Sequence, residues 1–276
     1  MKKLFQIELI KTLNNSTFRV IIGLHFLLFL LLVYVFTRVD ITAPGFSTKK
    51  VFMFPNVWEV LSWMASWFNM LFLGIIIIVL TGNEFSFKTA RTQIMNGLSR
   101  NEFLLGKSLV ILIIALWGLL LVFLTSIVVG LFFTPDVTFS LIFQNSSSIL
   151  IYFLQATAYM FFALLIVSLF RSNALSIMMY LLIFILIEPI IRVFFPKVVR
   201  PYFPTKVLKD LTPFPEFLSI TSDSKVVDAS GQNQFDLDAI GILPSSIPMG
   251  TSIVLAIIYI ALFVGITYWI IQKRDF

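Results

Sequence analysis

The sequence predicts an all-α polytopic membrane protein. Its 276 residues are 59% hydrophobic and only 12% charged, with a mean hydropathy of +0.98, whereas soluble domains carry about 25% charged residues. Four long stretches contain no Asp, Glu, Lys or Arg, namely 60–83, 108–135, 137–170 and 239–272. Because about 20 apolar residues in a helix span the hydrocarbon core of a bilayer, each stretch is long enough to cross a membrane.

Six transmembrane helices are predicted, and they form one transmembrane domain over 1–276. Only 171–173 separate the fourth and fifth helices, so these two are expected to form an antiparallel hairpin. The largest segment outside the helices is 196–250, which precedes the sixth. The predicted spans are 20–37, 58–80, 104–133, 148–170, 174–195 and 251–271.

The distribution of Lys and Arg near the span ends predicts the orientation, because cytoplasmic loops carry an excess of these residues. One side of the membrane receives both chain termini, the 83–107 segment and Arg171. On the other side, the first loop has Arg38, Lys49 and Lys50, the loop 134–147 has no basic residue, and the long segment 196–250 carries both signs of charge. We therefore expect a multi-pass protein of the cytoplasmic (inner) membrane with both termini in the cytoplasm and 196–250 outside.

Composition and short motifs exclude several kinds of function. The net charge of +6 is spread over span ends, whereas a nucleic-acid-binding protein would show a clustered basic face. The absence of cysteine removes disulfides, thiolate metal sites and a cysteine nucleophile. Neither H-E-x-x-H nor G-x-S-x-G occurs. We expect no catalytic residues and no metal site in this chain.

The segment 83–107, between spans two and three, is predicted to contain a short cytoplasmic helix over 85–96. Gly97 suits the left-handed position that follows a helix end. Ser99 and Glu102 have the spacing of a capping box, so the third helix should begin there. The alternative is an ordinary interfacial loop that carries the positive charge of any cytoplasmic segment.

A phosphate-binding motif is nearly present in the same segment. Residues 101–108 match G-x-x-x-x-G-K-[ST] except at the first glycine. That loop needs a preceding strand and a soluble helix after it, whereas Lys107 leads directly into a membrane helix. We therefore expect this chain to bind no nucleotide itself.

The order of short motifs around this segment resembles the permeases of ABC type-2 exporters. Their cytoplasmic loop has an acidic residue, a Thr-x-Arg-like stretch, Ser-Arg, and then Gly-Lys at the start of span three. The matching residues here are Glu84, Thr89, Arg91, Ser99, Arg100, Gly106 and Lys107. The ends of the chain, 7–11 and 273–276, and the layout of the six spans are also similar to that family.

The resemblance implies a permease that dimerises, with an identical or homologous copy, and docks two ATP-binding subunits. ATP and magnesium would then bind in the partner, and this chain would hold no cofactor. In that family the loop between spans two and three forms the helix that couples the permease to the ATPase. The residues expected to serve this coupling here are Glu84, Phe87, Arg91, Ile94 and Arg100.

Three ionisable residues are predicted to lie at membrane depth, where such groups are costly and often functional. Glu188 directly precedes Pro189, which should kink the fifth span, and Arg192 follows one turn later, where the two charges can pair. They are either a gate or substrate contact, or an ion pair satisfied within the bundle. His25 has no ligand partners at metal spacing and is expected to bond to a neighbouring helix.

The segment 196–250 is rich in proline at its start and polar over 221–238, without the spacing of a calcium loop. The apolar stretches 211–220 and 240–247 are candidates for re-entrant helices, as in the family. A plain surface loop is the alternative.

Taken as a sequence, the chain is best interpreted as the membrane-spanning permease subunit of an ATP-driven exporter. One alternative is a secondary transporter that uses the intramembrane charges of Glu188 and Arg192, although no inverted repeat is visible. A second alternative is a membrane scaffold or immunity protein without transport activity.

Overall fold

A computed structural model describes the chain except for residues 1, 40–41, 44–45, 214–246 and 275–276. The protein is an all-α polytopic membrane protein, as the sequence predicts. Within the described part, six helices are long and apolar enough to cross a membrane. They are Ser16–Arg38, Val57–Ser86, Arg100–Phe133, Phe139–Phe170, Asn173–Val193 and Met249–Lys273.

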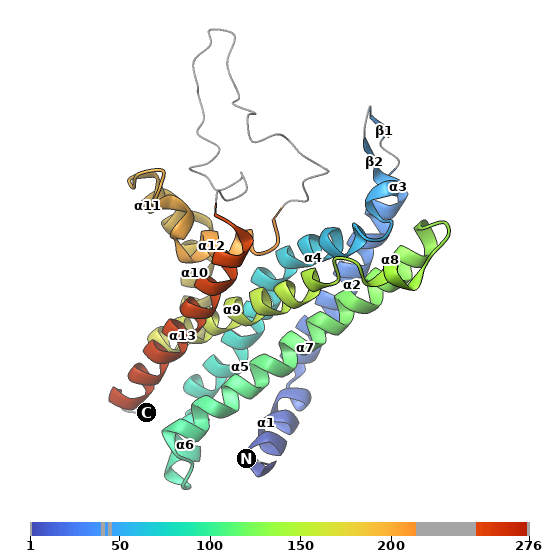
Figure 1. Cartoon of the computed structure of the whole chain (residues 1–276). Coiled ribbons are helices and arrows are strands. Elements are labelled where there is room, and N and C mark those ends of the chain that lie inside the picture. The colour runs from blue at the N-terminus through green and yellow to red at the C-terminus, as the bar shows by residue number, and fades with distance from the viewer. Residues whose placement is uncertain (1, 40–41, 44–45, 214–246, 275–276) are drawn as a thin grey trace.

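The described chain consists of helices and two short strands, which Figure 1 shows in place, and two of its elements are π-helical turns. In chain order they are α1 Lys2–Asn14, α2 Ser16–Arg38, β1 Thr42–Ala43, β2 Phe46–Ser47, α3 Thr48–Val51, α4 Val57–Phe68, η1 Asn69–Leu73, α5 Gly74–Ser86, α6 Thr89–Met95, α7 Arg100–Phe133, α8 Phe139–Phe143, α9 Ser147–Phe170, α10 Asn173–Leu182, η2 Ile183–Ile187, α11 Glu188–Val193, η3 Arg200–Tyr202, α12 Pro204–Asp210 and α13 Met249–Lys273. The two strands pair antiparallel, with Thr42 opposite Ser47.

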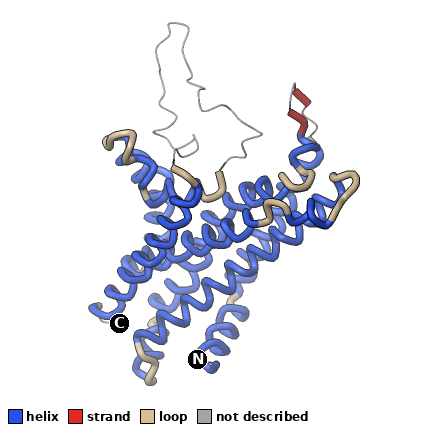
Figure 2. The backbone as a smooth tube through the Cα atoms, in the orientation of Figure 1, coloured by secondary structure: helices blue, strands red, loops and turns tan. Residues whose placement is uncertain are grey.

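The helices form a bundle with two distinct ends. Both chain termini and α6 lie at one end, and α8, α12 and the β1–β2 hairpin lie at the other (Figures 1 and 2). We call them the terminal end and the opposite end. The arrangement agrees with the predicted even number of crossings, which places both termini on one side.

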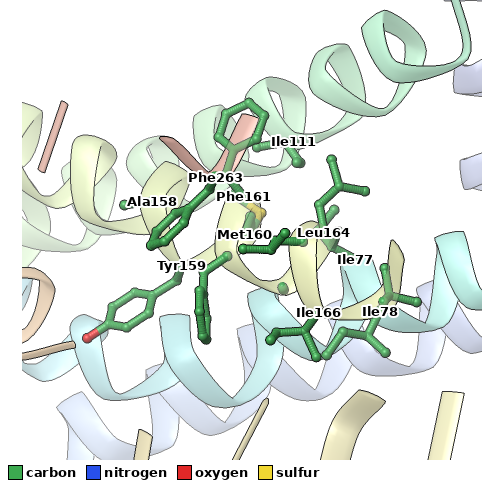
Figure 3. Packing of buried hydrophobic residues seen from close by; sticks show 14 of the residues in the cluster. Ile77, Ile78, Ile111, Ala158, Tyr159, Met160, Phe161, Leu164, Ile166 and Phe263 are labelled. Atoms are coloured by element: carbon green, nitrogen blue, oxygen red, sulfur yellow. The ribbon is translucent and has the colours of Figure 1, made fainter. Parts of the chain in front are cut away.

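Helix α9 is the centre of the bundle. In the most apolar part of its span, 78% of the stretch is buried. The corresponding share is 17% for Ser16–Arg38 and 22% for Asn173–Val193 and for Met249–Lys273. It packs against α4, α5, α7, α10 and α13. Figure 3 shows Met160 and Leu164 of α9 among side chains from three of these helices: Ile77, Ile78, Ile111 and Phe263. The peripheral helices keep broad apolar faces that suit lipid or another membrane chain.

Polar contacts fix α4 and α12 to this central helix. Asn69 lies in the π-helical turn η1, where its side chain accepts a 2.9 Å hydrogen bond from the hydroxyl of Tyr152. Gln155 donates to the carbonyl of Leu208 and to the hydroxyl of Thr212, both at 2.8 Å. Because buried polar groups need partners, these bonds position α12 at the opposite end.

The fifth span is distorted just before Pro189. The structure places the π-helical turn η2 between α10 and α11, so the helix continues through the proline into α11. A π-turn is one of the usual ways in which a helix accommodates an irregularity in its hydrogen-bonding. The span ends at Val193, two residues before the predicted end.

Candidate functional site

The short helix predicted between spans two and three is present, but it is shorter than predicted. The sequence indicated 85–96, whereas α6 covers only Thr89–Met95. Phe85 and Ser86 belong to α5, because the backbone N–H of Phe87 still bonds to the carbonyl of Asn83 at 2.9 Å. Lys88 then adopts a left-handed conformation with φ 57°, which separates the two helices.

Local sequence signals determine how α6 ends and α7 begins. Gly97 has φ 101°. Its N–H donates to the carbonyl of Ile94, and the N–H of Leu98 donates to the carbonyl of Gln93, both at 3.1 Å. This pair of bonds is a Schellman motif, which favours glycine. The capping box of Ser99 and Glu102 is formed, with bonds of 3.1 and 2.8 Å. Both predictions are confirmed.

Phe87, which precedes α6, forms an apolar and basic surface at the terminal end together with residues of α6. Phe87 and Met95 are each 75% exposed, and Arg91 is exposed between them. Ile94 is half-buried, and Ala90 is buried against the bundle. An aromatic and an arginine that are exposed close together are typical of protein-docking surfaces.

Glu84, in contrast, lies inside the bundle. It belongs to a cluster of charged residues that we call the four-charge cluster, formed by Glu8, Lys11, Glu84 and Lys107. Lys107 Nζ donates to Glu8 Oε2 at 2.7 Å and to Glu84 Oε1 at 2.6 Å. Lys11 Nζ lies 2.8 Å from Glu8 Oε1 and 2.6 Å from Glu84 Oε1. The cluster therefore joins α1, α5 and α7.

The cluster depends on a close approach of α1 to α7. Glu8, Glu84 and Lys107 are each no more than 5% exposed. A Cβ added at Gly106 would stand 3.1 Å from Cγ of Glu8, so a larger residue there would push the carboxylate away from Lys107. Sequence analysis missed the inward role of Glu8 and Lys11, although their spacing of three residues is the signal for a shared helix face.

The cluster shifts the titration of the two charges on α1. Burial raises the pKa of the Glu8 carboxyl, but the charges and hydrogen bonds of Lys107 and Lys11 outweigh burial, so its pKa lies below the ordinary value of 4.5. Burial lowers the pKa of the Lys11 ammonium, but the carboxylates of Glu84 and Glu8 outweigh it, so its pKa lies above 10.5. Both groups therefore stay charged over the physiological range.

Arg100 also serves a structural contact. Its guanidinium donates to the carbonyl of Ile271 at 2.9 Å and to that of Gln272, both in the last turn of α13. Gln272 in turn donates to Asn101 at 2.7 Å. A cation at the C-terminus of a helix is favoured by the helix dipole. Arg100 thus ties the start of α7 to the end of α13.

A cavity of about 260 Å³ lies between α1, α5, α6 and α7. Its apolar lining is formed by Ile77, Leu80, Phe87 and Val110. Its polar lining includes the four-charge cluster and six neighbours, which are Thr12, Asn15, Thr81, Asn83, Thr89 and Gln93. The cavity is therefore adjacent to the exposed surface of α6.

The intramembrane residues of the fifth span lie at the opposite end. Glu188 is buried and accepts hydrogen bonds from the backbone N–H groups of Thr205 at 2.9 Å and Lys206 at 3.2 Å. The hydroxyl of Thr205 donates to the same carboxylate. Because the first N–H groups of a helix have no partner within the helix, Glu188 satisfies those of α12 and holds it against α11.

Arg192 is buried one turn after Glu188, and the two side chains interact electrostatically. Their function as a gate or substrate contact stays a prediction. The contact of Glu188 with the start of α12 could not be anticipated, because 17 residues separate Glu188 from Thr205 and no periodic pattern links them.

His25 does not make the hydrogen bond to a neighbouring helix that the sequence analysis expected. It is 1% exposed, and neither ring nitrogen has a hydrogen-bond partner among the described residues. The centroid of its imidazole ring instead lies 6.1 Å from the ring centroid of Phe68 and 6.0 Å from that of Phe72. Aromatic packing has replaced the expected polar contact.

Within the described ranges, no group of three or more His, Cys, Asp or Glu is arranged to hold a metal ion.

The candidate re-entrant stretches 211–220 and 240–247 lie almost entirely outside the described residues. Leu211, Thr212 and Pro213, which follow α12, and Ile247 are the described residues of these stretches. Comparison with known proteins adds no identification: no family model and no curated protein matches this chain.

Removing Lys107 should destabilise the protein strongly. In Lys107→Met, Glu8 and Glu84 keep only Lys11 as a cationic partner in the cluster, and loss of one partner from a buried ion pair costs about 3–5 kcal/mol. We expect the free energy of unfolding in detergent to fall by about that amount. Lys88→Met, at an exposed position, should change it by less than about 0.5 kcal/mol. Equal stability of the two variants would contradict a structural role for the cluster.

The pH dependence of the cluster follows from the two pKa shifts. A lowered carboxyl pKa means that the stabilisation by Glu8 is complete above pH 4.5 and is lost as pH falls through the folded-state value. A raised ammonium pKa means that the stabilisation by Lys11 is complete below pH 10.5 and is lost only above the folded-state value. The difference in melting temperature between wild type and Glu8→Gln should therefore be constant from about pH 6 to 9 and shrink below about pH 4. A difference that disappears near neutral pH would be inconsistent with this assignment.

Proposed function

We propose that this protein is the membrane-spanning permease subunit of an ATP-driven exporter. It would work as a dimer in the cytoplasmic membrane, with the terminal end in the cytoplasm, and dock separate ATP-binding subunits through α6. The observation that carries the proposal is α6 itself. It is a short helix held between two membrane spans, at the end of the bundle that also carries both termini. Arg91 and Met95 on α6, and Phe87 just before it, are exposed there.

The orientation is supported by the position of basic residues. Arg19, Lys88, Arg91 and Lys273 are exposed at the terminal end, where a positive excess is expected on the cytoplasmic side. The resemblance of 84–107 to the coupling segment of ABC type-2 permeases supports the same orientation. The family relation is itself part of the proposal and rests on this short segment and on the layout of the spans.

The connections of α6 favour transmission of movement into the membrane. On one side α6 follows α5, which contains Glu84, and on the other it leads through Gly97 into α7, which contains Lys107. The ion pair between these two residues holds α5 and α7 together directly below α6. Displacement of α6 by a partner would therefore move both helices, and with them α9, against which both pack.

Dimerisation is supported by the exposed apolar faces of the peripheral helices. The spans Ser16–Arg38, Asn173–Val193 and Met249–Lys273 are the least buried of the six. In a membrane such faces contact lipid or another chain, and a second permease copy is the partner that the exporter proposal requires. The substrate route would then lie between the two copies.

The test is co-purification of an ATPase with wild type and with Phe87→Ala/Arg91→Glu at equal membrane levels. An aromatic or arginine anchor at the centre of an interface contributes about 2 kcal/mol or more on truncation. We therefore expect the double variant to retain less than about a tenth of the ATPase. Both side chains are exposed, so the permease itself should remain inserted and stable.

Phe139→Ala/Arg38→Glu is a matched control. It removes an exposed phenylalanine and reverses an exposed arginine at the opposite end, and it should retain the ATPase. Undiminished co-purification with the α6 variant would contradict the coupling role of α6. Failure of the wild type to bind any ATPase would overturn the exporter proposal and leave the scaffold and secondary-transporter alternatives.

A further inference from the structure

Helix α6 is attached to the bundle in a way that lets it pivot. Lys88 before it has φ 57° and Gly97 after it has φ 101°, so a left-handed residue lies at each end. Of its seven residues only Ala90 is buried. Thr89 donates at 3.3 Å to the carbonyl of Glu84, in the helix just before α6. A short helix with a joint at each end and one buried side chain can turn as a unit while its own hydrogen bonds stay intact.

Two faces of α6 have different surroundings. Arg91 and Met95, which belong to the docking surface, are exposed, whereas Thr89 and Gln93 line the cavity. Each of these two cavity residues precedes a docking residue by two positions, and two positions rotate an α-helix by about 200°. The cavity therefore lies behind the face of α6 on which a partner would press.

The cavity leaves room for α6 to move. Protein interiors are close-packed, so a helix that moves into one normally has to displace side chains. Behind α6, in contrast, is a volume of about 260 Å³ with many polar lining residues, which water can fill and leave. Pressure on Arg91 and Met95 would therefore push Thr89 and Gln93 into space that packed side chains do not occupy.

The joint between α1 and α2 borders the same cavity. Thr12, in the last turn of α1, and Asn15, which separates the two helices, both line it. Asn15 has an extended backbone, with φ −72° and ψ 119°, and its side chain accepts a 3.1 Å hydrogen bond from the N–H of Phe18. Asn15 is thus the N-cap from which α2 begins.

The two helices that meet at this joint are held to different degrees. Helix α1 is tied to α7 and α5 by the four-charge cluster, in which Lys107 bonds to Glu8 at 2.7 Å and Lys11 to Glu84 at 2.6 Å. Helix α2 forms the least buried span, with 17% of its most apolar stretch buried. Because fewer packing contacts oppose movement of α2, a push at Asn15 would displace α2 and leave α1 in place.

We propose that docking of the ATP-binding subunit drives α6 into this cavity and that Asn15 passes the movement to α2. The inference rests on the proposed function and adds the first membrane span to the parts that the subunit moves. Asn15 acts as a positioning residue, because it holds the first turn of α2 and borders the space that Thr89 and Gln93 enter. The docking face sets the direction of the movement, and the size of the cavity limits its extent.

The first test asks whether α6 pivots, and it uses the full-length permease without ATPase. The chain contains no cysteine, so Thr12→Cys/Gln93→Cys places one thiol on α1 and one on α6. We expect these thiols to form a disulfide under mild oxidation. Thr89→Trp fills the cavity from α6 and should slow the reaction about tenfold, because the closed arrangement is then overpacked.

Thr92→Trp is the matched control for the pivot. Thr92 is an exposed residue of α6 that does not line the cavity, so the same enlargement there should leave the rate of disulfide formation unchanged. Failure of the cysteine pair to form a disulfide, or equal rates in the two tryptophan variants, would overturn the pivot whatever binds to α6.

The second test adds the ATPase that co-purifies with the permease, and ATP. The disulfide between positions 12 and 93 should then form about fivefold faster or more. The control pair Asn101→Cys/Gln272→Cys replaces side chains that are 2.7 Å apart and join α7 to α13, and its rate should not change. An unchanged or slower rate for the cavity pair in a complex that holds the ATPase would contradict the inference and leave docking intact. If no ATPase co-purifies, the proposed function fails, while the rates in the permease alone still decide the pivot.

The role of Asn15 is tested by labelling at the other end of α2. Val39, the C-cap of α2, is exposed, and ATP should change the maleimide labelling rate of Val39→Cys about fivefold or more in the complex. Asn15→Ala should abolish this change, although ATP still speeds the disulfide between positions 12 and 93. Asn15→Asp keeps a capping oxygen and should restore the change. A response of full size in Asn15→Ala, or no response with Asn15 present, would show that Asn15 does not pass the movement to α2.

Discussion

Charges buried in the terminal end of this bundle must be paired, and that constraint organises the part of the molecule on which its proposed function depends. The bilayer and the packed helices offer little solvation, so an isolated ammonium or carboxylate there would be strongly destabilising. Lys107 meets the constraint by contacting two glutamates from different helices. The result is that α1, which does not cross the membrane, is fixed to α5 and α7, and α6 is held on a rigid base.

The opposite end is connected to this base through the buried helix α9. Gln155 of α9 holds the segment that follows α11 by bonding to Leu208 and Thr212, while Glu188 holds the first turn of α12. Movement of α5 and α7 at the terminal end would act on α9, and α9 would act on α12. The two ends are thus joined by a continuous series of packed helices and hydrogen bonds.

The sequence predicted the features that arise from local pattern. Uncharged apolar stretches located the six spans, Gly97 located the end of α6, and Ser99 with Glu102 located the start of α7. It could not anticipate contacts that join distant parts of the chain. Glu84, which the resemblance names as a coupling residue, faces Lys107, 23 residues later. Arg100 bonds to the end of α13, about 170 residues away, and no single-sequence pattern reveals such pairings.

The proposed function requires α6 to lie in the cytoplasm, where a partner that binds ATP must be. The absence of cysteine allows a direct measurement with one cysteine at a time. Met95→Cys on α6 and Phe139→Cys on α8 are both at highly exposed positions, at opposite ends of the bundle. In intact cells, a membrane-impermeant thiol reagent should label position 139 and should reach position 95 only after the membrane is permeabilised. Labelling of position 95 but not 139 in intact cells would place α6 outside and contradict the account.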